Sequence, residues 1–517
     1  MALLTDNQYL DFLSEGFLII EPSELSRGDH DYLYQRAIDL YEQSNKLKNP
    51  TAHLELLGDN LRFLVPEIDK MLNDSAIDEA LRSILGDDYI LHPHHYVHKS
   101  MKVDQVFHQD GNLPWNERGH YRSHRPDWLM LFYYPQSVNA KNGPTEIVRG
   151  TQYWTKNFET TDGWHSDDSL DRNAQDFMSS DDLSLRDKKQ REALDSLGVP
   201  NLQREFIQVP KGSVVIANYD LIHRGSRKLS NSAPRFMYKF YFARSKEPTA
   251  PSWEHHHKRN LSQLRPEIQP IIKQIWQWSL GQKAQQKIED PSSVFEKLHS
   301  GAEHHKVEAA YRLGMWKDPA AVTALLNGLQ DDSEATRRAS AYGLRAQGRA
   351  AAHGTMQALV NGSPQVRRVA AYALGTTENS NSQEALNALI ACIADDTDDL
   401  ARSNAAYSIG QIVRSPECKA ERVAKFLIER LQPGIESNNT EVANLPRSTV
   451  RQNLGYALTL LISNHKLPDD VMNSVLELAV SDEDRYVSGM ILQGLINKGN
   501  DPRLESLARK RRFLAHR

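Results

Sequence analysis

The 517-residue sequence has few cysteines, little net charge and no long apolar run. Its two cysteines, Cys392 and Cys418, are too few for a disulfide framework, so we expect a reducing compartment and a cytoplasmic protein. No stretch approaches the roughly 18 consecutive apolar residues of a membrane helix, and the N-terminus lacks the pattern of a secretory signal. The formal net charge of −5 gives no electrostatic reason to expect a nucleic-acid or membrane partner.

The chain is long enough for two or three domains, and its character changes near residue 250. Before this point, short runs rich in β-branched and aromatic residues are separated by turn residues, which predicts strands. These runs cover residues 16–20, 89–99, 128–134, 213–217 and 235–243. We therefore expect a β-rich domain over residues 1–250.

The last of these runs, residues 235–243, alternates with a period of two. Its two sets are Phe236, Tyr238, Phe240 and Phe242 on one side, and Arg235, Met237, Lys239 and Tyr241 on the other. This pattern predicts a strand with an aromatic outer face and a polar inner face. A barrel or sandwich whose interior holds a polar site has strands of this kind.

Residues 155–205 interrupt the strand pattern and are rich in Asp, Ser, Lys and Arg. A short helix is predicted over residues 183–197. The segment is either a solvated insertion or a lid over the mouth of the β domain, and the sequence leaves both interpretations open.

The second half of the chain repeats itself. Residues 251–300 are expected to be a linker with a connecting helix over residues 266–282. The units that follow include VEAAYRLG (307–314), RRASAYGL (337–344), VRRVAAYALG (366–375), LARSNAAYSIG (400–410) and TVRQNLGYAL (449–458). Each is preceded by another apolar helix, and paired helices at this period predict an α-solenoid over residues 301–517. The units resemble HEAT repeats.

A metal site is indicated by the segment VFHQDG at residues 106–111. Residues i and i+2 of a strand point to the same side, so His108 and Asp110 can present an imidazole and a carboxylate to one ion. His223, at the end of a later apolar run, can supply the third ligand. Two histidines and one carboxylate bind one face of iron(II) and leave positions open for O2 and a chelating co-substrate.

An anchor for such a co-substrate is the second requirement. 2-Oxoglutarate has a distal carboxylate, which the planar guanidinium of arginine can bind through two hydrogen bonds. Arg235 follows His223 by a turn-rich loop and lies on the predicted inner face of its strand. We expect it to bind this carboxylate.

The first ~245 residues resemble the phytanoyl-CoA dioxygenase family of Fe(II)- and 2-oxoglutarate-dependent oxygenases, whose fold is a double-stranded β-helix of the jelly-roll or cupin type. The resemblance is carried by YLDFLSEGFLII near the start, by HQD, by NGPTEIVRGTQYW (142–154) and by the stretch from His223 to Arg235. The third segment departs from the family pattern, because Arg149 replaces its proline.

The resemblance implies further roles. Gln109 is expected to line the co-substrate pocket, Ser226 to reach the 2-oxoglutarate carboxylate, and Trp128 to supply an aromatic wall. Asp110 favours oxygenation, since related halogenases have Gly or Ala at this position. No side chain is required as a general acid or base.

Substrate contacts are harder to predict. His92, His94, His95 and His98 cluster on one predicted strand, and Lys99, Arg122 and Arg125 could bind an anionic substrate near the mouth of the domain. Ordinary satisfied histidines and surface charge are the more common explanations for such residues.

Three functions are compatible with this organisation. The first is an oxygenase that hydroxylates a small or medium-sized metabolite with release of succinate and CO2, or carries out a desaturation, epoxidation or cyclisation. The second is a peptide or protein hydroxylase that captures its substrate on the concave surface of the solenoid. The third is a non-catalytic scaffold, against which the intact ligand set and Arg235 argue.

Overall fold

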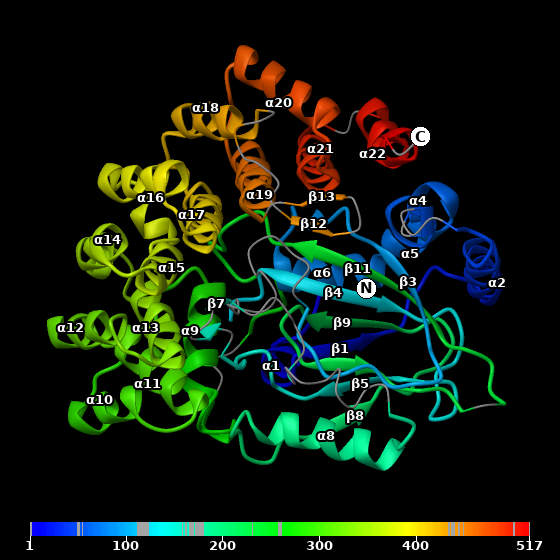
Figure 1. The fold of residues 1–517 in the computed structure, drawn as a ribbon, viewed down its shortest axis with the longest axis horizontal. Helices are drawn as coiled ribbons and strands as arrows, with labels where there is room; N and C mark the ends of the chain where they lie inside the picture. Colours follow the sequence, from blue (N-terminus) through cyan, green and yellow to red (C-terminus); the bar gives the residue numbers. More distant parts are fainter. Residues whose placement is uncertain are drawn as a thin grey trace.

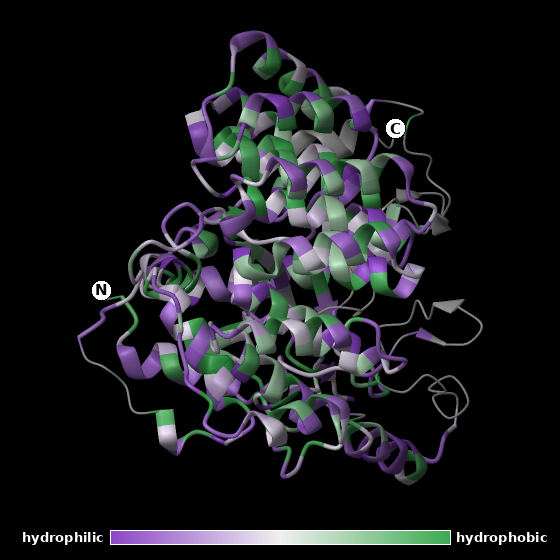
Figure 2. Ribbon diagram, turned by 90° about the vertical axis from the view of Figure 1, so that its left-hand side faces the viewer, coloured by the Kyte–Doolittle hydropathy of each residue, from purple (hydrophilic) through white to green (hydrophobic). Residues whose placement is uncertain are grey.

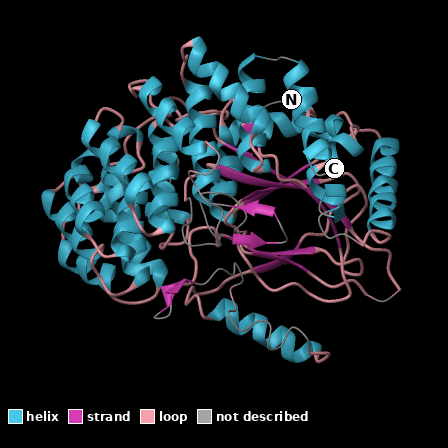
Figure 3. Cartoon of the chain, turned by 45° about the horizontal axis from the view of Figure 1, so that its top comes forward, coloured by secondary structure: helices cyan, strands magenta, loops and turns pink. Residues whose placement is uncertain are grey.

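The computed structural model describes residues 3–515, except 49–51, 54, 111–123, 158, 161–162, 165–169, 171–179, 230, 257–260, 433–434, 436–439, 443–444, 448 and 500–501. The β-rich part and the helical repeats are arranged as two regions in contact (Figure 1). The helices of the repeats form a curved row around one side of the strands (Figure 3).

Two antiparallel sheets form the core of the first region, and neither of them closes into a barrel. The larger has the order β1-β9-β4-β11-β2, with β3 also paired to β11, and the smaller has the order β10-β5-β8. Their strands are β1 (Phe17–Ile20), β2 (Ile90–Leu91), β3 (Tyr96–Lys99), β4 (Trp128–Tyr133), β5 (Thr145–Val148), β8 (Arg204–Phe206), β9 (Val214–Asn218), β10 (His223–Gly225) and β11 (Phe236–Ala243). The expected double-sheet architecture is confirmed.

Helices cover one side of the larger sheet. They are α1 (Asp6–Glu15), α2 (Arg27–Ser44), η1 (Glu55–Asp59), α4 (Leu61–Leu64), α5 (Ile68–Leu72) and α6 (Ser75–Leu85). Helix α1 begins at a capping box formed by Thr5 and Gln8, and it ends at Gly16, whose φ of 87° suits glycine. This turn leads directly into β1, which pairs with β9.

The alternation predicted for residues 235–243 is confirmed. On the outer face, the ring of Phe236 packs against Tyr34 and Tyr41, and the Tyr238 hydroxyl donates to the Leu33 carbonyl at 2.7 Å. On the inner face, Lys239 and Tyr241 point to Asp110. The period of two therefore separates a hydrophobic packing surface from the wall of a polar site.

The second region is a solenoid of paired helices. Its outer helices are α10 (Pro291–His299), α12 (Pro319–Gly328), α14 (Ala352–Asn361), α16 (Gln383–Asp395), α18 (Ala420–Leu431) and α20 (Asp469–Ser481). Its inner helices are α11 (Glu303–Met315), α13 (Glu334–Gln347), α15 (Pro364–Ala373), α17 (Asp399–Ile412), α19 (Thr449–Asn464) and α21 (Arg485–Gly499). Hydrophobic and hydrophilic residues alternate along these helices (Figure 2), as expected where one side of each helix is buried.

Shorter elements complete the chain. They are the 3-10 helices η3 (Leu261–Gln263), η4 (Gly348–Ala351) and η5 (Thr377–Asn379), the hairpins β6 (Glu159–Thr160) with β7 (Gly163–Trp164) and β12 (Thr440–Val442) with β13 (Leu445–Arg447), and the last helix α22 (Pro502–Ala515). The predicted connecting helix is α9 (Gln269–Ser279), and α10 already pairs with α11. No helix among the described residues is both long and apolar enough to cross a membrane.

A row of buried tyrosines lies on the inner helices, where the repeats placed Tyr311, Tyr342, Tyr372, Tyr407 and Tyr456. Neighbouring rings in this row lie 5.9 to 6.5 Å apart. The row faces the first region: the Tyr311 hydroxyl lies 2.9 Å from Nδ1 of His124, and the Tyr456 ring lies 5.1 Å from that of Trp128. The solenoid thus uses its inner side to hold the β-rich region.

The segment at residues 155–205 touches both regions where it is described. The predicted helix is α8 (Leu183–Asp195), and its Gln190 accepts a hydrogen bond from the Phe107 backbone at 2.8 Å. At the other end of the segment, Glu159 pairs with Arg337 and Arg368 of the solenoid. These contacts make the described parts of the segment a bridge between the ligand-bearing strand and the repeats.

Candidate metal and co-substrate site

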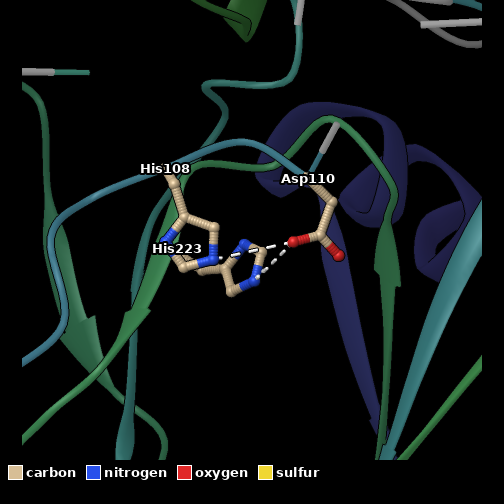
Figure 4. A group of neighbouring side chains, drawn as sticks. All are labelled: His108, Asp110 and His223. Carbon is tan, nitrogen blue, oxygen red and sulfur yellow. Dashed lines mark ion pairs between the residues drawn. The ribbon is translucent and has the colours of Figure 1, made fainter. Parts of the chain in front are cut away.

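His108, Asp110 and His223 meet on the inner side of the larger sheet, as their spacing predicts (Figure 4). His108 and His223 form an antiparallel bridge through two backbone hydrogen bonds of 3.0 and 3.1 Å. Nε2 of each histidine lies 3.6 Å from Oδ1 of Asp110. Ligands about 2.1 Å from one ion and at right angles lie about 3 Å apart, so a small inward movement would suffice for coordination.

The backbone fixes how both rings present their nitrogens. Nδ1 of His108 lies 2.9 Å from the Val106 carbonyl, and Nδ1 of His223 lies 2.9 Å from the Leu221 carbonyl. A carbonyl can only accept, so each Nδ1 carries the proton. Each Nε2 therefore directs a lone pair toward Asp110, which is the tautomer that metal coordination requires.

The second oxygen of Asp110 is held by two side chains of β11. Lys239 Nζ lies 2.5 Å from Oδ2, and the Tyr241 hydroxyl donates to the same oxygen at 2.7 Å. Burial disfavours the charged carboxylate, but the positive charge of Lys239 outweighs this effect and holds the pKa of Asp110 well below its usual value. Asp110 is thus an ionised carboxylate with a fixed orientation, as a metal ligand requires.

His223 is held in its neutral form. Burial, followed by the neighbouring His108 and Lys239, lowers the pKa of His223 to about 3. The Phe132 ring lies 5.8 Å from the His223 ring and covers one side of it. A neutral imidazole is the form that binds a metal, so no proton has to be displaced at neutral pH.

Arg235 lies just before β11 and is buried, with a relative exposure of 3%. Its Nε donates to the Gly143 carbonyl at 2.9 Å, whereas its Nη1 has no hydrogen-bond partner in the described part of the chain. Burial lowers the pKa of Arg235, and the side chains that act against this effect are Tyr134 and Tyr41, not a carboxylate. A buried guanidinium without a counter-ion is costly, so this site fits the carboxylate of a bound ligand.

Gln109 and Ser226 are engaged elsewhere. The Gln109 amide donates to the carbonyls of Trp154 and Asp220 at 2.9 and 2.7 Å. The Ser226 hydroxyl donates to the Pro144 carbonyl. Both contacts hold the backbone that carries the ligands, and the co-substrate contacts expected for these two residues stay predictions.

Trp128 and Lys99 do not lie beside the ligands. Trp128 is on the inner face of β4 but at its far end, where its ring contacts His92 and Tyr456. Lys99 pairs with Phe236 in the sheet, and its Nζ lies 5.3 Å from the Tyr41 ring on the outer face. Lys99 therefore lies on the outer face, whereas the alternation of β3 turns His98 inward, and the substrate contact expected of Lys99 stays a prediction.

Arg122 and Arg125 were expected to bind substrate at the mouth of the β-rich domain. Arg122 lies outside the described residues. Arg125 is engaged at the junction of the two regions, where its Nη1 lies 3.4 Å from Glu247 and its guanidinium lies 4.7 Å from the Trp278 ring. Arg125 thus binds neighbouring protein groups, and the simpler explanation of its charge as structural fits better than substrate binding.

Three inner residues received no role in the sequence analysis. Lys239 and Tyr241 follow Arg235 at positions i+4 and i+6, so the alternation already placed them inside. His98 stands opposite Met237 in the sheet. Burial, together with the charges of Lys239 and Arg235, holds the pKa of His98 well below its usual value, which makes it a neutral part of the wall. The cluster of histidines in this part of the sequence could have indicated His98, but the sequence does not show which of these side chains points inward.

Comparisons with known proteins agree with this geometry. Residues 16–237 match the family model described as phytanoyl-CoA dioxygenase (PhyH), and residues 352–436 match HEAT repeats. The N-terminal region is a PhyH domain. The chain is therefore a non-haem iron, 2-oxoglutarate-dependent oxygenase that carries HEAT repeats. Iron, 2-oxoglutarate and O2 are the cofactor and co-substrates of the PhyH domain.

Solved structures similar to part of this chain include EctD, HygX and ThoJ. EctD from S. alaskensis with 2-oxoglutarate and 5-hydroxyectoine is 15% identical over 50% of this chain and 83% of its own, with a TM-score of 0.33. HygX from Streptomyces hygroscopicus with nickel and 2-oxoglutarate is 16% identical over 51% and 94%, with a TM-score of 0.31. The non-heme monooxygenase ThoJ in complex with nickel is 10% identical over 48% and 88%, with a TM-score of 0.30. A search of curated proteins finds no match.

Proposed function

We propose that this oxygenase hydroxylates a small or medium-sized metabolite, with His108, Asp110 and His223 as the iron ligands and Arg235 as the partner of the distal 2-oxoglutarate carboxylate. With iron bound at this site, O2 would be the oxidant, and 2-oxoglutarate would supply two of the electrons for its reduction and leave as succinate and CO2. The single observation that carries the proposal is the fixed geometry of two Nε2 lone pairs directed at one ionised carboxylate oxygen.

The protein's own residues would then bind, orient and shield. The backbone carbonyls of Val106 and Leu221 hold the two imidazoles in one tautomer. Lys239 and Tyr241 hold Asp110 by its second oxygen and leave the first free for the metal. The Phe132 ring and the burial of His223 keep bulk water from this side of the site.

Arg235 would orient the co-substrate. Its unpartnered Nη1 can donate to one oxygen of the distal carboxylate, and the pairing would supply the missing counter-ion. The guanidinium of Arg235 loses its hydration when the protein folds. Binding of the carboxylate therefore carries no further cost for burying this cation, and the site is preorganised for the ligand. No acid or base is assigned among the side chains.

Turnover of 2-oxoglutarate tests the proposal. Purified full-length protein with Fe(II), 2-oxoglutarate and O2 should release succinate, and the rate should rise when the right metabolite from a broad panel is added. His108→Ala should lose both the basal and the stimulated release. Absence of succinate from the iron-loaded wild type, with the whole panel present, would refute the proposal.

The domain boundaries and the compartment belong to the same proposal. We place the PhyH domain at residues 1–250 with the insertion at residues 155–205, the linker at 251–300 and the repeats at 301–517, with α10 at the end of the linker as an added outer helix. The pairing of α10 with α11 supports a solenoid that begins within the segment 251–300. Two buried free cysteines, Cys392 and Cys418, support a reducing, cytoplasmic environment.

The peptide-hydroxylase alternative requires an open concave surface on the solenoid. The inner helices instead bury their tyrosines against the PhyH domain, with relative exposures of 0% at Tyr407 and Tyr456 and 3% at Tyr342. The surface that the alternative needs is therefore occupied within the chain itself. This observation favours the metabolite substrate over the peptide.

A further inference from the structure

We propose that a cavity between helix α8 and the outer face of the smaller sheet binds a small organic acid, that is, a carboxylate with a short apolar chain. The cavity has a volume of about 210 Å³, below the roughly 300 Å³ at which sites for drug-sized ligands begin. Its wall is partly charged and partly apolar, and it contains none of the proposed metal ligands. The site is therefore separate from the candidate metal site and does not depend on the proposed function.

The register of the smaller sheet places the charged wall on one face. Arg224 follows His223 directly in β10, so the two side chains leave the strand on opposite sides. Arg224 pairs with Glu146 of β5, and Glu146 pairs with Phe206 of β8, so these three side chains form a row across the sheet. Arg204, two residues before Phe206, belongs to the same face. The cavity thus lies on the side of β10 that faces away from the metal ligands.

Arg224 supplies an unused hydrogen-bond donor in this wall. The residue is buried, with a relative exposure of 2%, and its Nε donates to Oε2 of Glu146 at 2.7 Å. Oε1 of the same carboxylate accepts from Nε of Arg204 at 2.6 Å, so one buried carboxylate is shared by two arginines. Nη1 of Arg224 has no hydrogen-bond partner in the part of the chain that the structure describes. A ligand carboxylate would satisfy this donor, which is costly to bury alone.

Asp187 of α8 is the carboxylate that a ligand would replace. Its Oδ1 lies 3.9 Å from Nη2 of Arg224, and its Oδ2 lies 3.7 Å from Nη2 of Arg227. Both distances exceed that of a hydrogen bond, and Asp187 is partly exposed. Arg227 has a closer partner in Asp104, whose two oxygens accept from its backbone and its guanidinium. Asp187 can therefore turn to solvent at little cost, and Arg224 is the cation that gains most from a bound anion.

The apolar part of the wall indicates the rest of the ligand. Phe206 and Leu229 line the cavity, and both are large hydrophobic side chains that remain exposed. Ala140 and Pro144 line it as well. Apolar side chains around a few polar groups are typical of a site for a small molecule. A carboxylate held at Arg224 would leave a short chain to cover Phe206 and Leu229, which an inorganic anion cannot do.

Calorimetric titration of the full-length protein with hexanoate tests the proposal. The protein is loaded with Mn(II) and 2-oxoglutarate, so that the co-substrate site is filled, and the ionic strength is held constant. We expect the wild type to bind hexanoate more tightly than acetate, because buried methylene groups add to affinity. Arg224→Lys keeps the charge beside Glu146 but has no group in place of Nη1. It should weaken hexanoate binding about tenfold, as the loss of one charge-assisted hydrogen bond predicts.

Asp187→Asn should have the opposite effect. It removes the carboxylate that competes with the ligand and should strengthen hexanoate binding about threefold, as expected for a partly exposed ion pair. This variant leaves no buried charge unpaired, so it tests the site even if Arg224→Lys disturbs the fold around Glu146. Asp195→Asn makes the same charge change at the exposed last residue of α8 and should leave the affinity unchanged.

Phe206→Ala tests the apolar part of the wall. The variant shortens an exposed side chain, so the fold should not depend on it. We expect hexanoate to bind about threefold more weakly, because its chain loses an apolar contact, and acetate to bind as in the wild type.

Several results would overturn the proposal. One is the absence of hexanoate binding to the wild type. Another is equal affinity in the wild type, Arg224→Lys and Asp187→Asn, which would place the carboxylate elsewhere on the protein. Binding that 2-oxoglutarate abolishes, or that is lost in Arg235→Gln, would place it at the co-substrate site. Turnover is not measured in any of these titrations, so a failure of the proposed function would leave their outcome unchanged.

Discussion

Buried charges gather in two regions of the molecule, at the metal site inside the sheet and between the solenoid and the PhyH domain. In the second region the charges have counter-ions: Arg338, with 1% relative exposure, binds both Glu303 and Glu334 at 2.6 Å. Likewise, Asp127 and Arg414 pair at 2.8 Å with no exposed side-chain surface. At the candidate metal and co-substrate site, no carboxylate of the described residues pairs with the buried Arg235, and Asp110 pairs with Lys239.

We infer that the paired buried charges stabilise the fold, whereas the unpaired charge of Arg235 serves to bind a ligand. A matched buried pair costs stability when one partner is removed, because the other charge is left uncompensated. An unmatched buried charge already destabilises the free protein and gains its partner on binding. Substitutions in the two regions should therefore change different measurements.

The largest effect is expected at the ligands. His223→Ala removes one of the three proposed metal ligands, and we expect succinate release to fall below detection while the folded protein remains. The measurement is succinate formation at saturating Fe(II), together with circular dichroism to check the fold. His353→Ala, an exposed histidine of α14, is the control and should keep full turnover. Substantial turnover in His223→Ala would exclude this residue as a ligand.

Substitutions of the paired charges between the solenoid and the PhyH domain should lower the free energy of unfolding. Arg338→Ala leaves Glu303 and Glu334 buried without their cation, and we expect the free energy of unfolding to fall by about 3–5 kcal/mol. Urea unfolding measures it, provided that the transition of the solenoid can be followed separately from that of the PhyH domain. Arg402→Ala, at a more exposed site, should cost less than ~1 kcal/mol. Equal losses in the two variants would show that the buried network is not the cause.

A smaller effect is expected where a side chain only orients a ligand. Tyr241→Phe removes the hydrogen bond to Oδ2 of Asp110 and keeps the ring. We expect about tenfold weaker metal binding, in line with the loss of an outer-shell partner. Titration with Co(II) measures this affinity. Tyr238→Phe, on the outer face of the same strand, loses the bond to Leu33 and should leave Co(II) binding unchanged.

Much of this arrangement could be predicted from the sequence, and the reasons are local. The spacing of His108 and Asp110 and the alternation of residues 235–243 follow from strand geometry, so the side that each residue faces was correct. The paired helices could likewise be predicted from the repeated units around Tyr311 to Tyr456, because their periodicity is also a local pattern. Fold class and metal ligands come from patterns that a short segment carries by itself.

What could not be predicted depends on contacts between distant segments. Nothing near Trp128 shows that the solenoid covers the end of its strand, and nothing near Tyr486 shows that it meets His94. The face on which Lys99 lies was not evident from the sequence, because the phase of a four-residue strand depends on its pairing with β11. The orientation of one domain on the other is set by tertiary packing, which periodicity does not encode.

The most direct test of the unmatched charge is the thermal stability of Arg235→Gln with and without ligand. With Mn(II) present, 2-oxoglutarate should raise the Tm of the wild type and have little effect on the variant, since ligand stabilisation follows affinity. Without ligand, the variant should be as stable as the wild type or more stable, because a buried unpaired charge is gone. A ligand-free variant that is strongly destabilised, yet still gains the full shift from 2-oxoglutarate, would contradict the account.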